Sequence, residues 1–106
     1  GRAACELAWI RRCKAGDLID VSALKLGRAR VLFMPGELFV EYQLAAQKMR
    51  PHHFVAMAAY GDYGPGYIGL ESAYPQGGYE TGHHVSLVAP SVEGVLLGAI
   101  SDLLTD

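Results

Sequence analysis

The sequence has little net charge and no long apolar run. It carries 9 Lys and Arg against 11 Asp and Glu, for a formal net charge of -2 at pH 7. We therefore expect no surface that attracts nucleic acid, which is bound through strongly basic patches. No apolar run reaches the roughly 18 residues of a membrane-spanning helix, so the sequence predicts no membrane span.

Cysteine is scarce, with 2 in the chain. Cys5 and Cys13 fall in one expected helix, where eight residues correspond to a rise of about 12 Å. That separation is too long for a disulfide, so both are expected to be free thiols with a structural role. The histidines lack the HExxH spacing of a zinc site. In each pair, His52-His53 and His83-His84, neighbouring side chains of an extended segment would point to opposite faces, so each pair could give one metal at most one ligand. We therefore expect surface histidines rather than a metal site.

What the chain does contain fits one domain covering residues 1–106, because 51% of its residues are hydrophobic and 19% are charged. The stretch RAACELAWIRRCKAG predicts a first helix with Ala4, Leu7 and Ala8 on one face, which Arg11 could extend, and with Gly16 as its C-terminal stop. Residues 18–27 and 29–34 are short β-prone runs, which predict two strands joined by a tight turn.

The rest of the chain alternates between helical and strand patterns. Apolar residues at helical spacing predict a second helix over 37–50, which Pro51 ends, and a third over 90–104 with Ser91 as N-cap. The apolar run HFVAMAAY between them is typical of a strand covered on both faces. We therefore predict an α/β fold, with helices packed on a small mixed or mostly parallel β-sheet.

The stretch YGDYGPGYIGLESAYPQGGYE holds five of the six tyrosines, placed between glycines and prolines. A loop of about twenty residues without structure of its own is usually functional, disordered or a linker. The aromatic content argues against disorder. Loop tyrosines, however, most often pack over glycine-rich turns and satisfy loop carbonyls, so a purely structural role is the alternative for each of them.

Glu37 follows a strand and a Pro-Gly pair and is expected to open the second helix. Open α/β sheets gather ligands at the carboxyl ends of their strands, so Glu37 and the tyrosine loop are expected to meet at one sheet edge. The alternative is that Glu37 only complements the dipole of its helix, an effect of about 0.3–1 kcal/mol.

MPGELF, followed after one helix and one strand by GYIGLESAYPQGGYE, resembles the closing part of the catalytic domain of neutral/alkaline ceramidases and their bacterial relatives. In that family the glutamate of Pro-Gly-Glu and the tyrosine of Tyr-Ile are zinc ligands, together with two histidines from far upstream. The resemblance implies zinc ligation by Glu37 and Tyr67, and oxyanion stabilisation by Tyr79 in the later Tyr-Glu pair. Tyr63 and Tyr74 lie in the loops that would touch the substrate.

The resemblance runs from about Asp17 to Leu104 and covers only the last portion of the longer family domain. It implies that the chain is a fragment of a larger α/β hydrolase-type metal domain, inactive by itself, whose partner is the upstream part of that domain. The interval from Glu37 to Tyr67 is shorter than in characterised ceramidases, and the loops GDYGPG and YPQGG differ, so the acyl-amide substrate stays open. A different hypothesis is a metal-free binding module whose tyrosine loop grips a sugar or a lipid head group.

Overall fold

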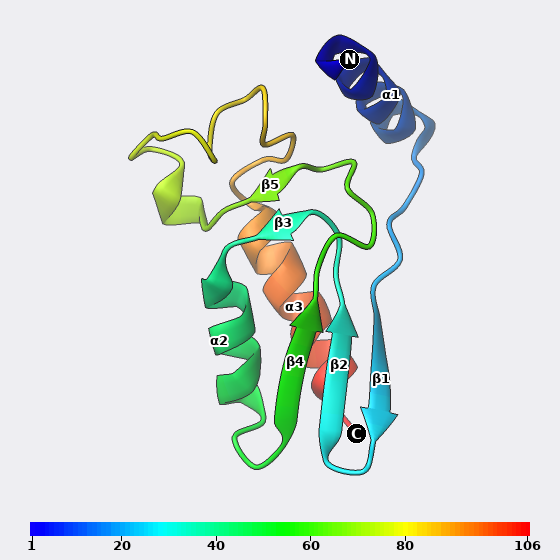
Figure 1. Cartoon of the computed structure of the whole chain (residues 1–106), viewed down its shortest axis with the longest axis vertical. Helices are drawn as coiled ribbons and strands as arrows, with labels where there is room; N and C mark the ends of the chain where they lie inside the picture. The colour runs from blue at the N-terminus through cyan, green and yellow to red at the C-terminus, as the bar shows by residue number, and fades with distance from the viewer.

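The computed structural model describes all 106 residues and confirms the α/β fold. Figure 1 shows helices α2 and α3 beside a small sheet, with helix α1 standing away from it. In chain order the elements are α1 (Arg2–Ala15), β1 (Ser22–Leu26), β2 (Ala29–Phe33), β3 (Glu37–Leu38), α2 (Val40–Met49), β4 (Phe54–Ala58), β5 (Tyr67–Ile68), a 3₁₀ turn (Glu71–Ala73) and α3 (Val92–Leu104).

The strands form two separate sheets. The larger has three strands in the order β1-β2-β4, and the smaller pairs β3 with β5. β1 runs antiparallel to β2 through the predicted tight turn, in which Gly27 has φ 58°. β2 runs parallel to β4, with Leu32 opposite Met57. The larger sheet is therefore mixed, as the sequence predicts.

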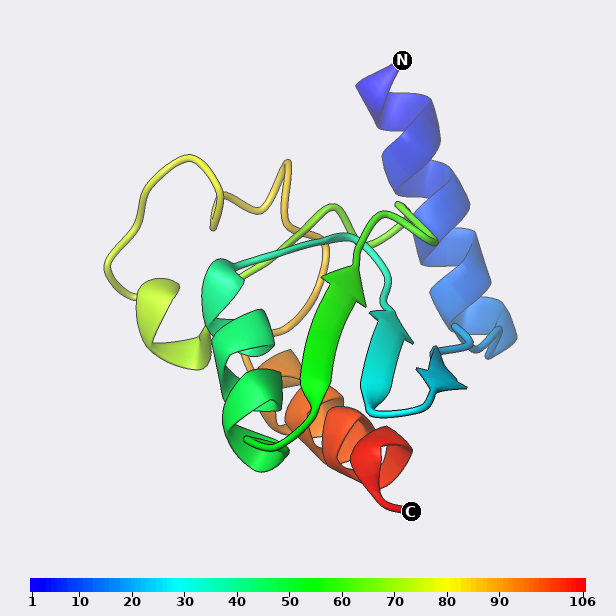
Figure 2. The same cartoon turned by 60° about the horizontal axis from the view of Figure 1, so that its bottom comes forward.

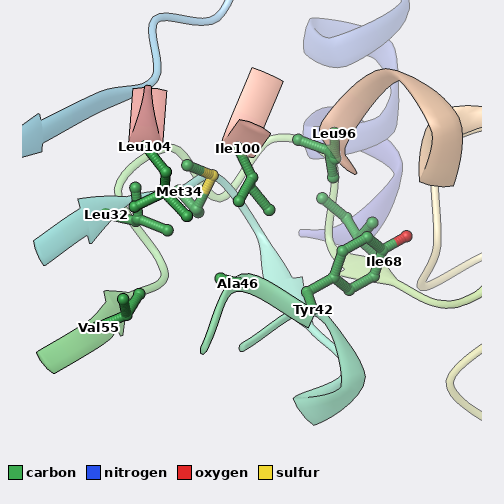
Figure 3. Packing of buried hydrophobic residues seen from close by; sticks show 9 residues of the cluster. All are labelled: Leu32, Met34, Tyr42, Ala46, Val55, Ile68, Leu96, Ile100 and Leu104. Carbon is green, nitrogen blue, oxygen red and sulfur yellow. The ribbon is translucent and has the colours of Figure 1, made fainter. Parts of the chain in front are cut away.

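Helices α2 and α3 pack against each other and cover one face of the larger sheet (Figure 2). Leu32 of β2 and Val55 of β4 meet Ala46 of α2 and Ile100 of α3 there (Figure 3). The core also contains Met34, Tyr42, Ile68, Leu96 and Leu104. Ile68 belongs to β5, so the core reaches under the smaller sheet and supports it from below.

The other face of the larger sheet is apolar and stays exposed. Its residues align across the strands, with Leu26 opposite Ala29 and Ala29 opposite Phe54. Phe54 is 74% exposed and Leu26 62% exposed. The sequence predicts that the strand β4 is covered on both faces. This prediction is wrong, because both packed helices lie on the same side of the sheet. Leu24 and Phe33 complete this surface, which we term the bare face.

Helix α1 forms where the sequence predicts it and ends at Gly16, whose φ is 76°. The face that carries Ala4, Leu7 and Ala8 is not packed on the sheet, because α1 buries no residue and Leu7 is 47% exposed. The partly buried side instead carries Glu6, Trp9 and Arg12. This side makes hydrogen bonds rather than apolar contacts, so apolar periodicity could not identify it.

Helix α2 begins at Val40, not at Glu37 as predicted. Glu37 lies in β3, where its N–H donates to the carbonyl of Gly66 at 2.9 Å. Phe39 N–H likewise donates to the carbonyl of Ile68 at 3.0 Å. These bonds to β5 hold residues 37–39 extended, so Glu37 does not sit in the first turn of a helix.

Cys5 and Cys13 are free, as predicted, and both are exposed. No helix of the chain combines the length and the apolar character that crossing a membrane requires.

Candidate functional site

Two glycines with left-handed backbone bring the smaller sheet together. Gly36 has φ 63°, and a Cβ there would lie 2.5 Å from the carbonyl oxygen of Gly66. Gly66 has φ 69°, and a Cβ there would run into the carbonyl oxygen of Val85. Three chain segments therefore cross at backbone contact, which only glycine allows. The Pro-Gly before Glu37 and the Pro-Gly before Tyr67 both serve this crossing.

Glu37 and Tyr67 are direct partners in the parallel pair of β3 and β5. Side chains at paired positions of neighbouring strands project from the same face of a sheet, so the carboxylate and the phenol are neighbours. Tyr63 approaches the same carboxylate, its hydroxyl donating to Oε2 of Glu37 at 3.3 Å. Three residues expected to share a site from the sequence are thus together.

The carboxylate of Glu37 and burial together raise the pKa of the phenols around it. Its negative charge is the main cause that raises the pKa of Tyr67, followed by burial. Burial first, and then Glu37, raise the pKa of Tyr63 and of Tyr60. All three phenols therefore keep their protons at neutral pH and are available as hydrogen-bond donors to a carboxylate or an oxyanion.

Tyr79 lies against Tyr67, with ring centroids 6.0 Å apart and planes at 78°. On its other side is His84, at 6.0 Å and 76°. The sequence predicts a surface position for His84, whereas the structure leaves its side chain only partly exposed. The turn between them makes the contact possible, since a Cβ at Gly82 would lie 2.9 Å from Cε1 of His84. Gly82 is therefore the sequence feature that could indicate the contact between Tyr79 and His84.

Tyr60 and Tyr74 lie near Glu37, Tyr63 and Tyr67 but make different contacts. Tyr60 stacks on Tyr63 at 5.8 Å and has φ 64°, a left-handed backbone that is costly for a bulky residue. Tyr74 turns inward, where its hydroxyl accepts from the N–H of Gly69 at 3.2 Å and bonds Oγ of Ser86 at 2.9 Å. The hydroxyl of Tyr74 is thus engaged within the loop itself.

Two hollows open on either side of Tyr67. The larger, of about 480 Å³, is lined by Tyr67 and by the carboxyl-bearing Glu37, Glu41 and Glu80. The smaller, of about 270 Å³, is lined by Tyr63, Tyr67, Tyr79 and His84 and on the side of α1 by Arg2, Cys5 and Glu6. Tyr67 is the shared wall, so a group held by Glu37 and Tyr67 would border both an acidic and an aromatic space.

The chain contains no group of three or more His, Cys, Asp or Glu side chains placed to hold a metal ion. Any metal at Glu37 and Tyr67 therefore needs further ligands. No protein-family model, no curated protein and no solved structure matches the chain.

Proposed function

We propose that the chain is the C-terminal part of a zinc-dependent amide hydrolase domain that resembles neutral ceramidase. The observation that carries this proposal is the pairing of Glu37 with Tyr67 in adjacent parallel strands. These are the two positions to which the resemblance gives zinc ligands, and the fold brings them together from separate motifs.

The donor set fits half of a zinc site. Glu37 offers a carboxylate oxygen and Tyr67 a phenol oxygen, and the remaining two ligands are the histidines expected upstream. Zinc held by Glu37, Tyr67 and two such histidines would act as a Lewis acid and would lower the pKa of a bound water towards about 7. Tyr67 must give up its proton to ligate, and Glu37 raises its pKa, so zinc affinity is expected to increase with pH.

Tyr79 is suited to a different task from Tyr67. Its ring contacts Tyr67 and faces the smaller hollow, so its hydroxyl can donate a hydrogen bond to the oxygen of an amide carbonyl as negative charge develops. Removing one such donor costs on the order of 3 kcal/mol in hydrolases. Tyr63 bonds Glu37 and would orient its carboxylate.

The bare face supports the view that more of a domain packs on this chain. Sheets with parallel strands are normally covered on both faces, and here Phe54 and Leu26 are left in water. An apolar surface of this kind is where the upstream part of the domain would lie.

One observation favours the alternative function, a metal-free binding module. The smaller hollow and the exposed stack of Tyr60 on Tyr63 present phenol rings of the kind that grip a sugar or a lipid head group. This function needs neither Glu37 nor an upstream partner.

Zinc content of the longer protein separates the two functions. Glu37→Gln and Tyr67→Phe should each lower zinc affinity at least about tenfold, because each removes an oxygen ligand. Tyr79→Phe should keep the metal and lose about a hundredfold in kcat. Glu41→Gln is the matched control, since Glu41 lines the same hollow without pairing with Tyr67. Full zinc occupancy in Glu37→Gln would rule out its role as a ligand.

The 106-residue chain alone gives a second test. Two oxygen ligands without histidines should bind zinc no more tightly than about 1 μM, and the chain should show no amidase activity. Calorimetry on tag-free protein measures the affinity. Tight stoichiometric zinc would contradict the proposal and point to His84 or its neighbours as ligands of a site complete within this chain.

A further inference from the structure

Helix α1 reaches the rest of the chain through polar contacts that converge near the site. Nε1 of Trp9 donates to the carbonyl of Leu87 at 2.9 Å. The guanidinium of Arg12 grips Asp62 with two bonds, Nη1 to Oδ1 at 3.0 Å and Nη2 to Oδ2 at 2.7 Å. Both side chains of this ion pair are about two-thirds buried, at 34% and 32% exposed. Such bidentate pairs fix geometry as well as charge.

Asp62 also makes hydrogen bonds to the two segments that carry Glu37 and Tyr67. Its backbone carbonyl accepts from the N–H of Gly36 at 2.7 Å, one residue before Glu37. Its Oδ1 also accepts from the N–H of Gly64 at 3.0 Å, in the turn that leads to Tyr67. One aspartate therefore ties α1 to the start of β3 and to the segment that enters β5.

The contact is closely fitted as well as charged. A Cβ at Gly64 would lie 2.7 Å from Cε3 of Trp9 and 2.8 Å from Nη1 of Arg12. The guanidinium of Arg12 in turn lies 5.2 Å from the centre of the Trp9 ring. The side chains of Trp9 and Arg12 therefore pack directly on the turn at Gly64. Their stacking helps to fix the guanidinium that binds Asp62.

We propose that Arg12 is a positioning residue that acts through Asp62 to keep Glu37, Tyr63 and Tyr67 in their mutual arrangement. The geometric part of this inference depends only on the contacts above. Its consequence for zinc and catalysis rests on the proposed function. Because α1 buries no residue, loss of the Arg12 contact should disturb the site and leave the core intact.

Nuclear magnetic resonance of the 106-residue chain tests the geometric part. In Arg12→Gln the ring signals of Tyr63 and Tyr67 and the amide signals of Gly36 and Glu37 should shift, while the methyl signals of Leu32 and Ile100 stay in place. Arg12→Lys keeps the charge but not the two-bond geometry and should shift the same signals by a smaller amount. Arg11→Gln is the matched control, since Arg11 is the exposed neighbour on the same helix. Unmoved site signals in Arg12→Gln would overturn the proposal.

A second measurement uses the longer protein and relates Arg12 to activity. Arg12→Gln should weaken zinc binding about tenfold and lower kcat more than it raises KM, because it misplaces ligands without touching the substrate. Unchanged zinc affinity and kcat would overturn the catalytic consequence. If the unaltered protein holds no zinc and hydrolyses no amide, the proposed function fails, while the resonance shifts still decide whether Arg12 positions the cluster.

Discussion

The chain consists of two regions that are held together by different means. In the body, formed by β1, β2, β4, α2 and α3, apolar side chains such as Leu32 and Ile100 are fully buried. In the site region, formed by β3, β5, α1 and the loops around them, hydrogen bonds and glycine crossings such as Gly36 over Gly66 fix the chain. Packing makes the body stable, whereas specific backbone and ion-pair contacts place the reactive groups.

This difference determines how each region should respond to change. A truncation in the body removes packing that many residues share, so it should affect global stability. A change in α1 or in the loops of the site region should act more locally, because α1 buries no residue and the loops are held mainly by hydrogen bonds.

The largest effect is expected from Ile100→Ala in the body. Ile100 is 0% exposed, and the change leaves a cavity among Leu32, Ala46 and Leu104. We expect a loss of about 3 kcal/mol in the free energy of unfolding, measured by urea denaturation. Val95→Ala on the same helix is the control, since Val95 is 72% exposed and should change stability by less than about 0.5 kcal/mol. Similar losses in both would mean that α3 does not pack as described.

Gly36→Ala should be the most damaging change in the site region. The new methyl group would meet the carbonyl of Gly66 and the side chain of Ile68, at a φ of 63°. We expect the free energy of unfolding, measured by urea denaturation, to fall by about 2 kcal/mol, and the pairing of β3 with β5 to be disturbed. Gly98→Ala provides the contrast, because that glycine lies in α3 with open space around it. There the change should stabilise the chain by about 0.5–1 kcal/mol, and a loss would argue against the helix.

Tyr42→Phe tests the connection between the two regions. Tyr42 is buried in the body, and its hydroxyl donates to the carbonyl of Gly69, just after β5, at 2.7 Å. Its removal leaves a buried carbonyl unpaired, which should cost about 1–2 kcal/mol in thermal unfolding. Tyr79→Phe removes a hydroxyl from a residue that is 57% exposed and should cost less than about 0.5 kcal/mol. Equal effects would show that the bond to Gly69 does not support the smaller sheet.

The smallest effect on stability is expected on acidification of the contact between α1 and the loop. Hydrogen bonds from Arg12, then from the backbone of Gly64, hold the pKa of Asp62 below its ordinary value. The stabilisation is therefore complete above the unfolded pKa of about 3.9 and is lost as pH falls through the lower folded pKa. Fluorescence of Trp9 should report release of α1 in that acidic window. Asp62→Asn should abolish the transition, and its persistence would assign it to another carboxylate.

Much of the body could be predicted from the sequence, because its signals are local. The turn at Gly27 and Arg28, the strand over 54–58 and the helix over 92–104 all have periodic or punctuating patterns. The predicted order of motifs also anticipated that Glu37 and Tyr67 lie together. The bare face could not be predicted, because an apolar strand has the same sequence pattern whether one face or both are covered.

The site region was harder to predict because its contacts join distant residues. Arg12 and Asp62 are 50 positions apart, and nothing periodic marks either as a partner of the other. The proximity of His84 to Tyr79 depends on a turn at Gly82, and the left-handed backbone of Tyr60 has no sequence signal in a tyrosine. Apolar spacing predicts a helix at Glu37 because such spacing carries no information about the backbone bonds of this residue to β5.

The bare face has a further consequence for the heat capacity of unfolding. A 106-residue domain ordinarily shows an increase of about 1.3–1.6 kcal/mol/K on unfolding, which comes from apolar surface newly exposed to water. Here Leu26 and Phe54 are in water already, so the increase should fall below that range and the stability curve should be flatter with temperature. A partner that covers this face should therefore bind with a negative change in heat capacity, because it removes the same apolar surface from water. Calorimetry of the association can measure this change.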